Sequence, residues 1–233
     1  MTRRIQILAG ITLLLCSHGL ALGADKEPGS FVPFAVASVR FEQNATDGDA
    51  EVVFEVKGGK EGLAKLTVVS PDGRTAIDFT APNASTLGIR QFRFETPEPQ
   101  DVKGLKSAYP EGVYTFTGAT AAGGKLHGKS MLNHTLPATA SFLQPRAGAR
   151  NVGAKNLKIA WTSVKNLAAY IITIKERNLG VNLTAKLPGS VTTFAVPNGF
   201  LRPGMEYQLA VGTVSAEGNI SFVETTFTTA GNQ

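Results

Sequence analysis

Residues 201–211 read Leu-Arg-Pro-Gly-Met-Glu-Tyr-Gln-Leu-Ala-Val, and this stretch decides the fold class. Tyr207, Leu209 and Val211 stand at every second position, which is the period of a β-strand with one face in a core. Pro203 and Gly204 bound the run, as turn residues bound the other alternating segments. The stretch therefore predicts a short strand of an antiparallel sheet.

The same alternation recurs along most of the chain, and no long stretch has the three-to-four spacing of an amphipathic helix. The other alternating segments are residues 52–57, 66–79, 114–132, 157–161, 170–174, 194–196 and 222–227. Two of them contain hairpin turns, Pro71-Asp72-Gly73 and Ala122-Gly123-Gly124. We therefore predict an all-β protein.

Between residues 136 and 141 the alternation lapses into Pro, Ala and Thr, which is typical of a short linker between domains. We place the boundary near residue 139. The sequence then predicts two tandem antiparallel β-sandwiches, the first over residues 25–138 and the second over residues 139–233.

The first 24 residues have the pattern of a secretory signal peptide. Arg3 and Arg4 precede an apolar run over residues 5–16, and small residues follow up to Ala24. The run is shorter than the roughly 18 to 20 residues that cross a bilayer, and no later run is longer. We expect an exported chain that begins near Asp25, lies in the periplasm or outside the cell, and has no transmembrane segment.

Cys16, the single cysteine, lies in this predicted signal, so the exported chain is expected to fold without disulfides. Loss of Arg3 and Arg4 would lower the net charge from +5 to +3, with no run of like charges. A mildly basic chain of this kind does not indicate nucleic-acid binding. The partners that we expect are another envelope protein or a second copy of the chain.

The second half resembles a fibronectin type III domain over roughly residues 141–229. The motifs that carry the resemblance are residues 157–161, 169–172, 187–194, 201–211 and 217–221. The first half is similar to the immunoglobulin-like region that precedes such a domain in a family of exported bacterial proteins of uncharacterised function. That similarity depends on residues 44–50, the Pro-Asp-Gly hairpin, and residues 109–118 and 133–137. The resemblance implies a fold and a compartment but no reaction and no ligand.

The aromatic and histidine side chains are better explained by the fold than by chemistry. Trp161 shares a predicted strand face with core residues, and Tyr207 is expected to bond the backbone near a strand corner. His134 has the parity of the core positions, whereas His127 lies on the opposite face with Lys125 and Lys129. Histidines on opposite faces do not converge on zinc, and no Gly-x-Ser-x-Gly elbow presents a serine for a catalytic triad, so we predict no catalytic, cofactor-binding or metal-binding residues.

The loop that holds Asn44, Asp47, Asp49 and Glu51 is the best candidate for metal binding. Oxygen ligands at alternate positions around a glycine can bind calcium. Asp-Gly and Asn-Ala-Thr are also ordinary turn sequences, and the span lacks a full calcium-binding loop, so turn chemistry is the favoured explanation.

Three further features have a structural and a functional explanation. Five Asn-x-Ser/Thr sequences begin at Asn44, Asn83, Asn133, Asn182 and Asn219, which we interpret as turns and strands rather than glycan acceptors. Lys125, His127 and Lys129 form a basic stripe, which we interpret as charge that protects a strand edge. Phe31 and Phe34 are expected either to form a strand on the first domain or to add to a neighbouring copy.

Three functions are compatible with these features. The favoured one is a non-enzymatic interaction or scaffold protein of the bacterial cell envelope. The alternative is a carbohydrate-binding or calcium-binding accessory module. The least favoured is a hydrolase with an unrecognised site, for which the sequence offers no nucleophile and base in a familiar motif.

Overall fold

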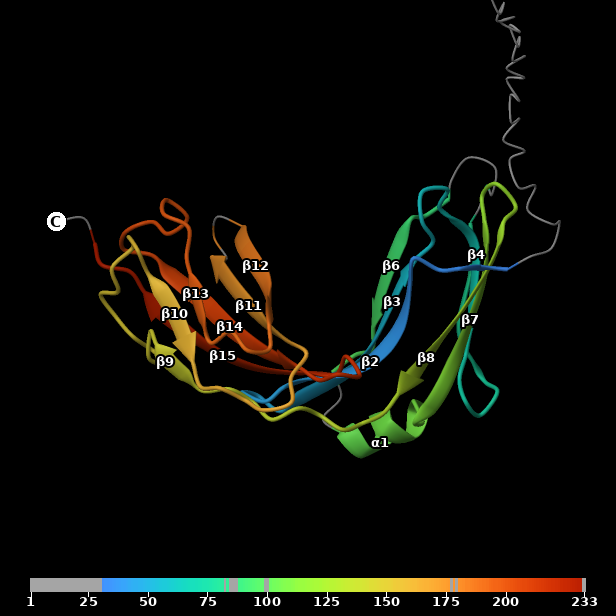
Figure 1. Ribbon diagram of the computed structural model, residues 1–233, viewed down its shortest axis with the longest axis horizontal. Helices are drawn as coiled ribbons and strands as arrows, with labels where there is room; N and C mark the ends of the chain where they lie inside the picture. Colours follow the sequence, from blue (N-terminus) through green and yellow to red (C-terminus); the bar gives the residue numbers. More distant parts are fainter. Residues whose placement is uncertain are drawn as a thin grey trace, which may run out of the picture. The chain divides into compact units, whose positions relative to one another are not determined.

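The computed structural model describes residues 31–81, 83, 88–98, 101–176, 178 and 180–231. The predicted signal peptide, residues 1–24, with Cys16 and the expected start near Asp25, lies outside the described residues. The described chain is an all-β protein of two sandwiches, which confirms the predicted fold class (Figure 1).

The first sandwich contains eight strands and one short helix. Its elements are β1 (Val32–Pro33), β2 (Val36–Asn44), β3 (Asp49–Lys57), β4 (Leu63–Val69), β5 (Thr75–Thr80), β6 (Gln91–Glu95), α1 (Val102–Ala108), β7 (Gly112–Thr120) and β8 (Lys125–Leu132). One layer is a five-stranded sheet in the order β1-β8-β7-β4-β5, and the other is made of β2, β3 and β6.

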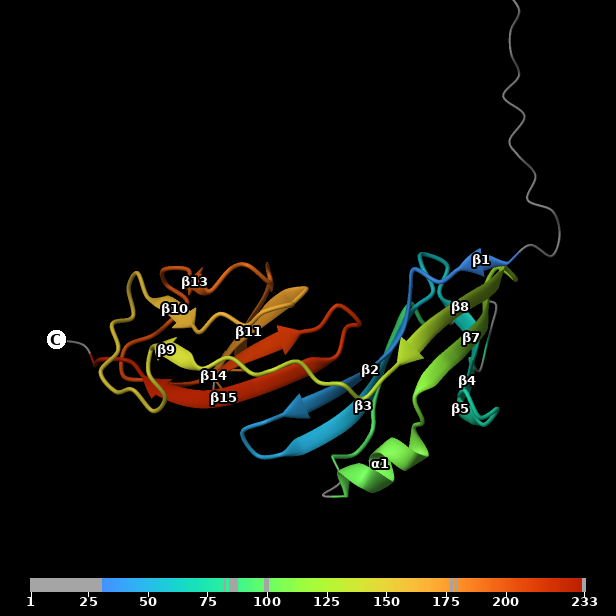
Figure 2. The same cartoon turned by 60° about the horizontal axis from the view of Figure 1, so that its bottom comes forward.

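The second sandwich contains the remaining seven strands. They are β9 (Phe142–Gln144), β10 (Lys158–Trp161), β11 (Ala169–Glu176), β12 (Val181–Pro188), β13 (Thr193–Ala195), β14 (Glu206–Val214) and β15 (Ile220–Thr228). A three-stranded sheet, β13-β10-β9, forms one layer, and β12, β11, β14 and β15 form the other. Residues 133–141, between β8 and β9, have no regular secondary structure (Figure 2).

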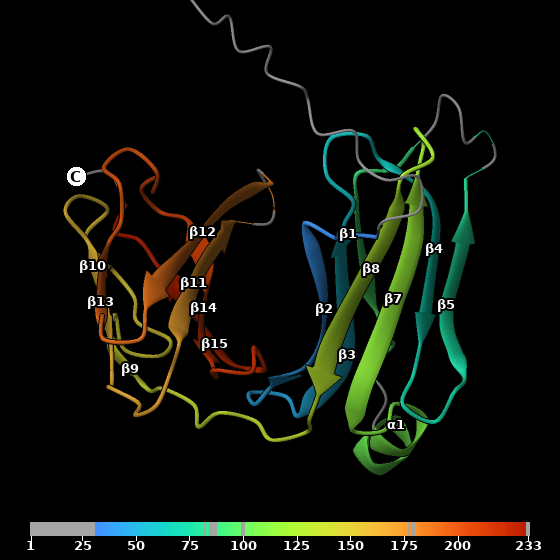
Figure 3. The same cartoon turned by 45° about the vertical axis from the view of Figure 1, so that its right-hand side comes forward.

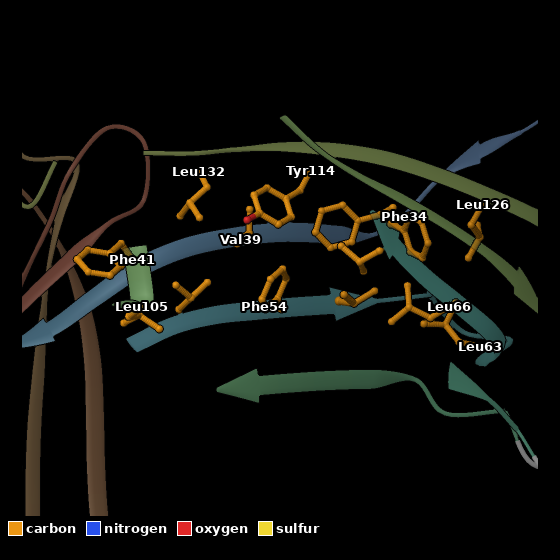
Figure 4. Packing of buried hydrophobic residues seen from close by; sticks show 14 of the residues in the cluster. Phe34, Val39, Phe41, Phe54, Leu63, Leu66, Leu105, Tyr114, Leu126 and Leu132 are labelled. Atoms are coloured by element: carbon orange, nitrogen blue, oxygen red, sulfur yellow. The ribbon is translucent and has the colours of Figure 1, made fainter. Parts of the chain in front are cut away.

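The core of the first sandwich is built from alternate residues of both layers. Phe41 and Phe54 point inward from one layer and Tyr114 from the other, while Leu105 reaches the core from α1 (Figure 4). Each large apolar side chain that is fully buried contributes about 1.5 to 3 kcal/mol to stability. Both predicted hairpins are present, and Gly73 adopts the positive φ of +84° that its turn requires.

The core of the second sandwich surrounds the tryptophan. The Trp161 ring is 1% exposed and its centroid lies 5.3 Å from that of Tyr170. Tyr207 stacks on Phe227 at 5.5 Å. The prediction that Trp161 is a core residue is therefore confirmed, although its indole nitrogen has no hydrogen-bond partner among the described residues.

Both sandwiches use a tyrosine hydroxyl to fix the turn before a strand. The Tyr207 hydroxyl accepts a hydrogen bond from the backbone nitrogen of Arg202 at 2.8 Å, as the sequence predicted. Tyr114 donates its hydroxyl to the carbonyl oxygen of Pro110 at 3.2 Å, which the sequence analysis missed. The signal was available, because a proline stands four residues before each tyrosine, Pro110 and Pro203.

The two sandwiches share a sheet, which was not predicted from the sequence. β15 pairs in parallel with β2, with Ile220 opposite Glu42, Ser221 opposite Gln43 and Phe222 opposite Asn44. A seven-stranded sheet in the order β12-β11-β14-β15-β2-β3-β6 therefore provides one layer of each sandwich. The other pairs of named strands are antiparallel, as we predicted, except β1 with β8, and the isolated bridge between Val152 and Thr229 is also parallel.

The side chain of Asn219 holds this junction together. It is 2% exposed, and its Oδ1 accepts a hydrogen bond from the backbone nitrogen of Phe41 at 2.8 Å. Its Nδ2 lies 3.0 Å from the Asn133 carbonyl oxygen, 2.8 Å from Asn133 Oδ1 and 2.9 Å from the Thr135 carbonyl oxygen. One buried amide therefore contacts β2 and the segment that follows β8.

Ser221 extends the same network along β15. Its hydroxyl is fully buried, donates to the carbonyl oxygen of Pro137 at 2.7 Å and accepts from Nε2 of Gln43 at 3.0 Å. The segment that we predicted as a linker is therefore bonded to β15 at Pro137, and Asn133 and Thr135, which precede that segment, are bonded to Asn219. The boundary near residue 139 stays a prediction. The apolar side chains form one cluster that extends to Leu136 and another that begins at Ala140.

We expect Asn219→Ala to lower the free energy of unfolding by about 1 to 3 kcal/mol, because the buried Phe41 amide would lose its acceptor and the partly buried carbonyls of Asn133 and Thr135 would lose a donor. Asn182→Ala is the matched control, since Asn182 begins an Asn-x-Thr sequence, as Asn219 begins an Asn-x-Ser sequence, but is exposed on β12, and we expect a change within about 0.5 kcal/mol. Urea titration of residues 25–233 measures both. Equal midpoints for the two variants would contradict the role of Asn219.

Candidate functional site

A hollow of about 310 Å³ lies on the outer face of the seven-stranded sheet, where β15 meets β2. We call it the junction hollow. Both sandwiches contribute to its lining: Glu42, Gln43, Asn44, Glu51, Arg93 and Glu98 from the first, and Thr173, Lys175, Ala210, Phe222 and Glu224 from the second. Apart from Gln43, which has the strand parity of Phe41, and Glu98, which follows β6, these positions alternate with core residues, so their side chains point away from both cores.

Ion pairs order the first-sandwich side of the hollow: Arg40–Glu55 joins the neighbouring strands β2 and β3, Arg93–Glu42 joins β6 to β2 across β3, and the other two pairs lie within one strand. Glu42 is 5% exposed and contacts Arg40 at 2.5 Å and Arg93 at 3.5 Å. Arg40 also reaches Glu55 at 3.5 Å, and Arg93 pairs with Glu95. Opposite charges on adjacent strands stabilise a sheet face by roughly 0.2 to 1 kcal/mol for each pair. The network fixes where the charges of the hollow stand.

Among the groups that line the hollow, Glu51 is the one whose pKa is shifted most by its surroundings. Its partial burial, followed by repulsion from Glu42 and Glu95, raises the pKa of its carboxyl from 4.5 to about 7, against a weaker lowering by Arg93. Glu98 at the rim has a raised pKa for similar reasons, partial desolvation first and then the charges of Asp49 and Asp47. The hollow therefore gains negative charge around neutral pH.

In the acidic loop that we considered for calcium, the side chains of Asn44 and Asp47 make hydrogen bonds within the turn itself. Asn44 accepts from the Thr46 nitrogen at 3.1 Å and donates its Nδ2 to Asp47 at 3.1 Å, while Asp47 accepts from the Asp49 nitrogen at 3.4 Å. These are the turn contacts that we favoured. Within the described ranges, no three His, Cys, Asp or Glu side chains are arranged to hold a metal ion.

The two described histidines lie where the sequence placed them, far from a shared site. Nε2 of His134 is 2.9 Å from the Tyr109 carbonyl oxygen, and its ring packs against Phe41 at the edge of the core. His127 faces outward on β8 beside the exposed Lys125 and Lys129. The structure does not bring them together.

The structure supports one interpretation made from the sequence and refines another. Asn219 begins an Asn-x-Ser sequence, and its buried amide agrees with the structural explanation of that sequence. The basic stripe was interpreted as protection of a strand edge, but β8 is not free along its length. β1 pairs with it in parallel, Val32 opposite Leu126 and Pro33 opposite His127. The first of the two arrangements considered for Phe31 and Phe34 is therefore the one that the structure contains.

The sequence analysis missed the junction hollow itself. Its lining residues come from two parts of the chain that lie far apart, residues 42–98 and residues 173–224. The local signal was the alternation of charge in β2 and β3, where Arg40, Glu42 and Glu55 occupy one face. That signal indicates that the face is exposed to solvent, but it does not indicate which strand pairs next in the sheet.

No protein-family model and no curated protein matches the chain. Solved structures that it resembles include three of fibronectin type III domains. They are chicken CNTN1 FN1-FN3 domains (11% identity over 86% of this chain and 65% of that chain, TM-score 0.33), a two-domain segment of chicken tenascin (15%, 84% and 99%, 0.33), and fibronectin(III)-like modules of Clostridium thermocellum CbhA (12%, 84% and 92%, 0.34). At these TM-scores the likenesses carry no argument about function. This chain thus spans slightly less than two thirds of the CNTN1 fragment.

The pKa of Glu51 predicts a pH dependence of stability. Because the folded state holds this proton up to about pH 7 and the unfolded chain releases it near pH 4.5, the contribution of Glu51 to stability falls between those values. We expect Glu51→Gln to match the wild type near pH 4 and to be more stable by about 1 to 2 kcal/mol at pH 8, after allowance for solvent screening.

Glu55→Gln is the matched control on the same face of β3. Burial alone would raise the pKa of Glu55, but Lys57 and Arg40 lower it below its usual value. Its ionised form therefore stabilises the fold at pH 8 and that contribution is lost in acid, so its variant should be the less stable one at pH 8. Urea midpoints from pH 4 to pH 8 measure both, and the same sign for the two variants would contradict this assignment.

Proposed function

We propose that the protein is a non-enzymatic interaction protein of the bacterial cell envelope, which binds a partner protein at the junction hollow. Export, the envelope and the absence of catalysis are part of the proposal. The resemblance to exported proteins with fibronectin type III domains and the signal-peptide pattern of residues 1–24 support the compartment. Among the described residues, no helix is long and apolar enough to cross a membrane.

The observation that carries the proposal is that side chains from both sandwiches line one hollow. Asn219 and Ser221 hold β15 against β2, so Glu42 and Glu224 belong to the same surface. A surface that is ordered before binding loses little entropy when a partner docks. Fibronectin and immunoglobulin-like modules chiefly position such surfaces.

The charges of the hollow define the partner's contact. Four carboxylates line it, from Glu42, Glu51, Glu98 and Glu224, against the two basic side chains of Arg93 and Lys175. Thr173 and Asn44 add hydrogen-bonding groups, and Phe222 adds an apolar wall. A lysine or arginine side chain on an exposed segment of the partner fits this lining, because opposite charge steers association and fixes orientation.

Site-specific photo-crosslinking in the native envelope tests the proposal. A photoreactive amino acid replaces Lys175 in the hollow or, as a control, the exposed Lys158 on β10 of the opposite sheet. Each variant loses one lysine, so the net charge is matched. We expect a discrete protein adduct from position 175 and none from position 158.

A second pair of variants links the adduct to the charges. Glu98→Lys reverses a charge at the rim, and Glu217→Lys makes the same reversal on an exposed turn outside the lining. We expect the adduct from position 175 to fall about tenfold with Glu98→Lys, the size of effect expected for like charge at a rim, and to persist with Glu217→Lys. Adducts of equal yield from both positions, or none from either, would refute binding at the hollow.

A further inference from the structure

The five-stranded sheet of the first sandwich has a basic outer face. Its strands β8, β7, β4 and β5 lie side by side (Figure 3). Lys125, His127 and Lys129 point outward from β8, and Lys65 points outward from β4. We call this surface, with Phe31, Thr115 and Thr117, the basic face.

The register of the strands sets the spacing of its charges. Lys65 and Lys125 both stand opposite Ala119 of β7, so they are two strands apart, about 10 Å between their backbones. Lys125 and Lys129 are four residues apart on one strand, about 13 Å. The basic groups therefore form an open array with His127 between two of the lysines.

The charges of the basic face are free, unlike those of the opposite sheet. In the part of the chain that the structure describes, no carboxylate lies within 4 Å of the amino groups of Lys65, Lys125 or Lys129. Asp78 on β5 is the one carboxylate on the strands of this face, and it accepts a hydrogen bond from the Thr67 hydroxyl at 3.2 Å. An anion that approaches this face meets lysines without competing partners.

An exposed aromatic ring lies beside these charges. Phe31 is 62% exposed, and its ring centroid is 5.9 Å from that of His127, nearly edge-on at 67°. It is tethered there because Val32 and Pro33 pair with β8 and because Phe34 is buried in the core. The ring therefore offers an apolar surface directly beside charged and polar groups.

Hydroxyl groups fill the space between the lysines. Thr117 stands opposite His127, and Thr115 stands opposite Lys129, both on the outward side of β7. Thr115 and Thr117 are partly exposed. The basic face thus combines positive charge, hydroxyls and one aromatic ring on a flat sheet.

We propose that the basic face binds an anionic polysaccharide that carries carboxylate groups. Lys65, Lys125 and Lys129 pair with carboxylates along the polymer, and the threonine hydroxyls bond to sugar hydroxyls. The Phe31 ring packs against the apolar C–H face of a sugar ring, as aromatic side chains do where a ligand is apolar on one side and polar on the other. Inorganic polyphosphate meets the lysines equally well but gives Phe31 no apolar ring face to contact. Single-stranded nucleic acid can stack a base on Phe31, so single-stranded DNA is the competing ligand, and tighter binding of it than of polygalacturonate would contradict the proposal. This inference does not rest on the junction hollow, which is lined from the other sheet.

Isothermal titration of residues 25–233 with polygalacturonate, which has one carboxylate per sugar, tests the proposal. The fully methyl-esterified polymer is the matched probe, since it keeps the sugar backbone and removes the charge. We expect binding of polygalacturonate that weakens between 50 mM and 500 mM salt and at least tenfold weaker binding of the ester, because exposed ion pairs are screened by salt.

Two variants separate the charge from the ring. We expect Lys125→Gln with Lys129→Gln to weaken binding about tenfold and Phe31→Ala to weaken it about threefold to tenfold. Lys155→Gln with Lys158→Gln, which removes two exposed lysines from the second sandwich, is the matched control and should change affinity less than twofold. Urea midpoints check that each variant stays folded.

Several results would overturn the proposal. They are no binding of polygalacturonate, equal binding of its ester, or equal loss with the control pair. Polyphosphate, single-stranded DNA or phosphatidylglycerol vesicles that bind as tightly as polygalacturonate, with no effect of Phe31→Ala, would show a general polyanion surface instead. That outcome also contradicts recognition of a polysaccharide.

Discussion

The buried amide of Asn219 is the interaction on which the arrangement of the described chain depends. A side chain with both donor and acceptor can satisfy backbone groups of two separate segments at once, and Asn219 does so for β2 and for residues 133–135. Without it the buried Phe41 amide would have no acceptor, at a cost of about 1 to 3 kcal/mol, and the partly buried carbonyls of Asn133 and Thr135 would lose a donor. The parallel pairing of β15 with β2 and the junction hollow beside it both follow from this contact.

The features that the sequence could predict are those encoded over a few neighbouring residues. Alternation placed Trp161 and Tyr207 in a core, and turn chemistry located the hairpin at Gly73. The junction could not be predicted, because Asn219 and Phe41 are 178 positions apart and parallel pairing has no turn to announce it. Glu51 is a similar case, since the charges that raise its pKa stand on β2 and β6.

The two outer faces of the first sandwich show how strand register sets the use of charge. On β2, β3 and β6, arginines and glutamates stand within reach of one another, so most of their attraction is spent inside the molecule. On β8, β7 and β4, lysines stand opposite threonine and alanine. The first face is ordered by these pairs, which leave Glu51, Glu98 and Glu224 outside them, whereas the lysines of the second face take part in no ion pair among the described residues.

Because the two layers of a sandwich turn their outer faces in opposite directions, occupancy of one face leaves the other open. The junction hollow is lined from the layer that contains β2, and the basic face belongs to the layer that contains β8. A partner protein and a polysaccharide could therefore be bound at the same time without steric conflict. Coupling between the two would require a shared two-state element, and the core between them, filled by Phe41, Phe54 and Tyr114, offers a packed connection rather than a hinge. We therefore expect the affinity of each face for its partner to be independent of whether the other face is occupied.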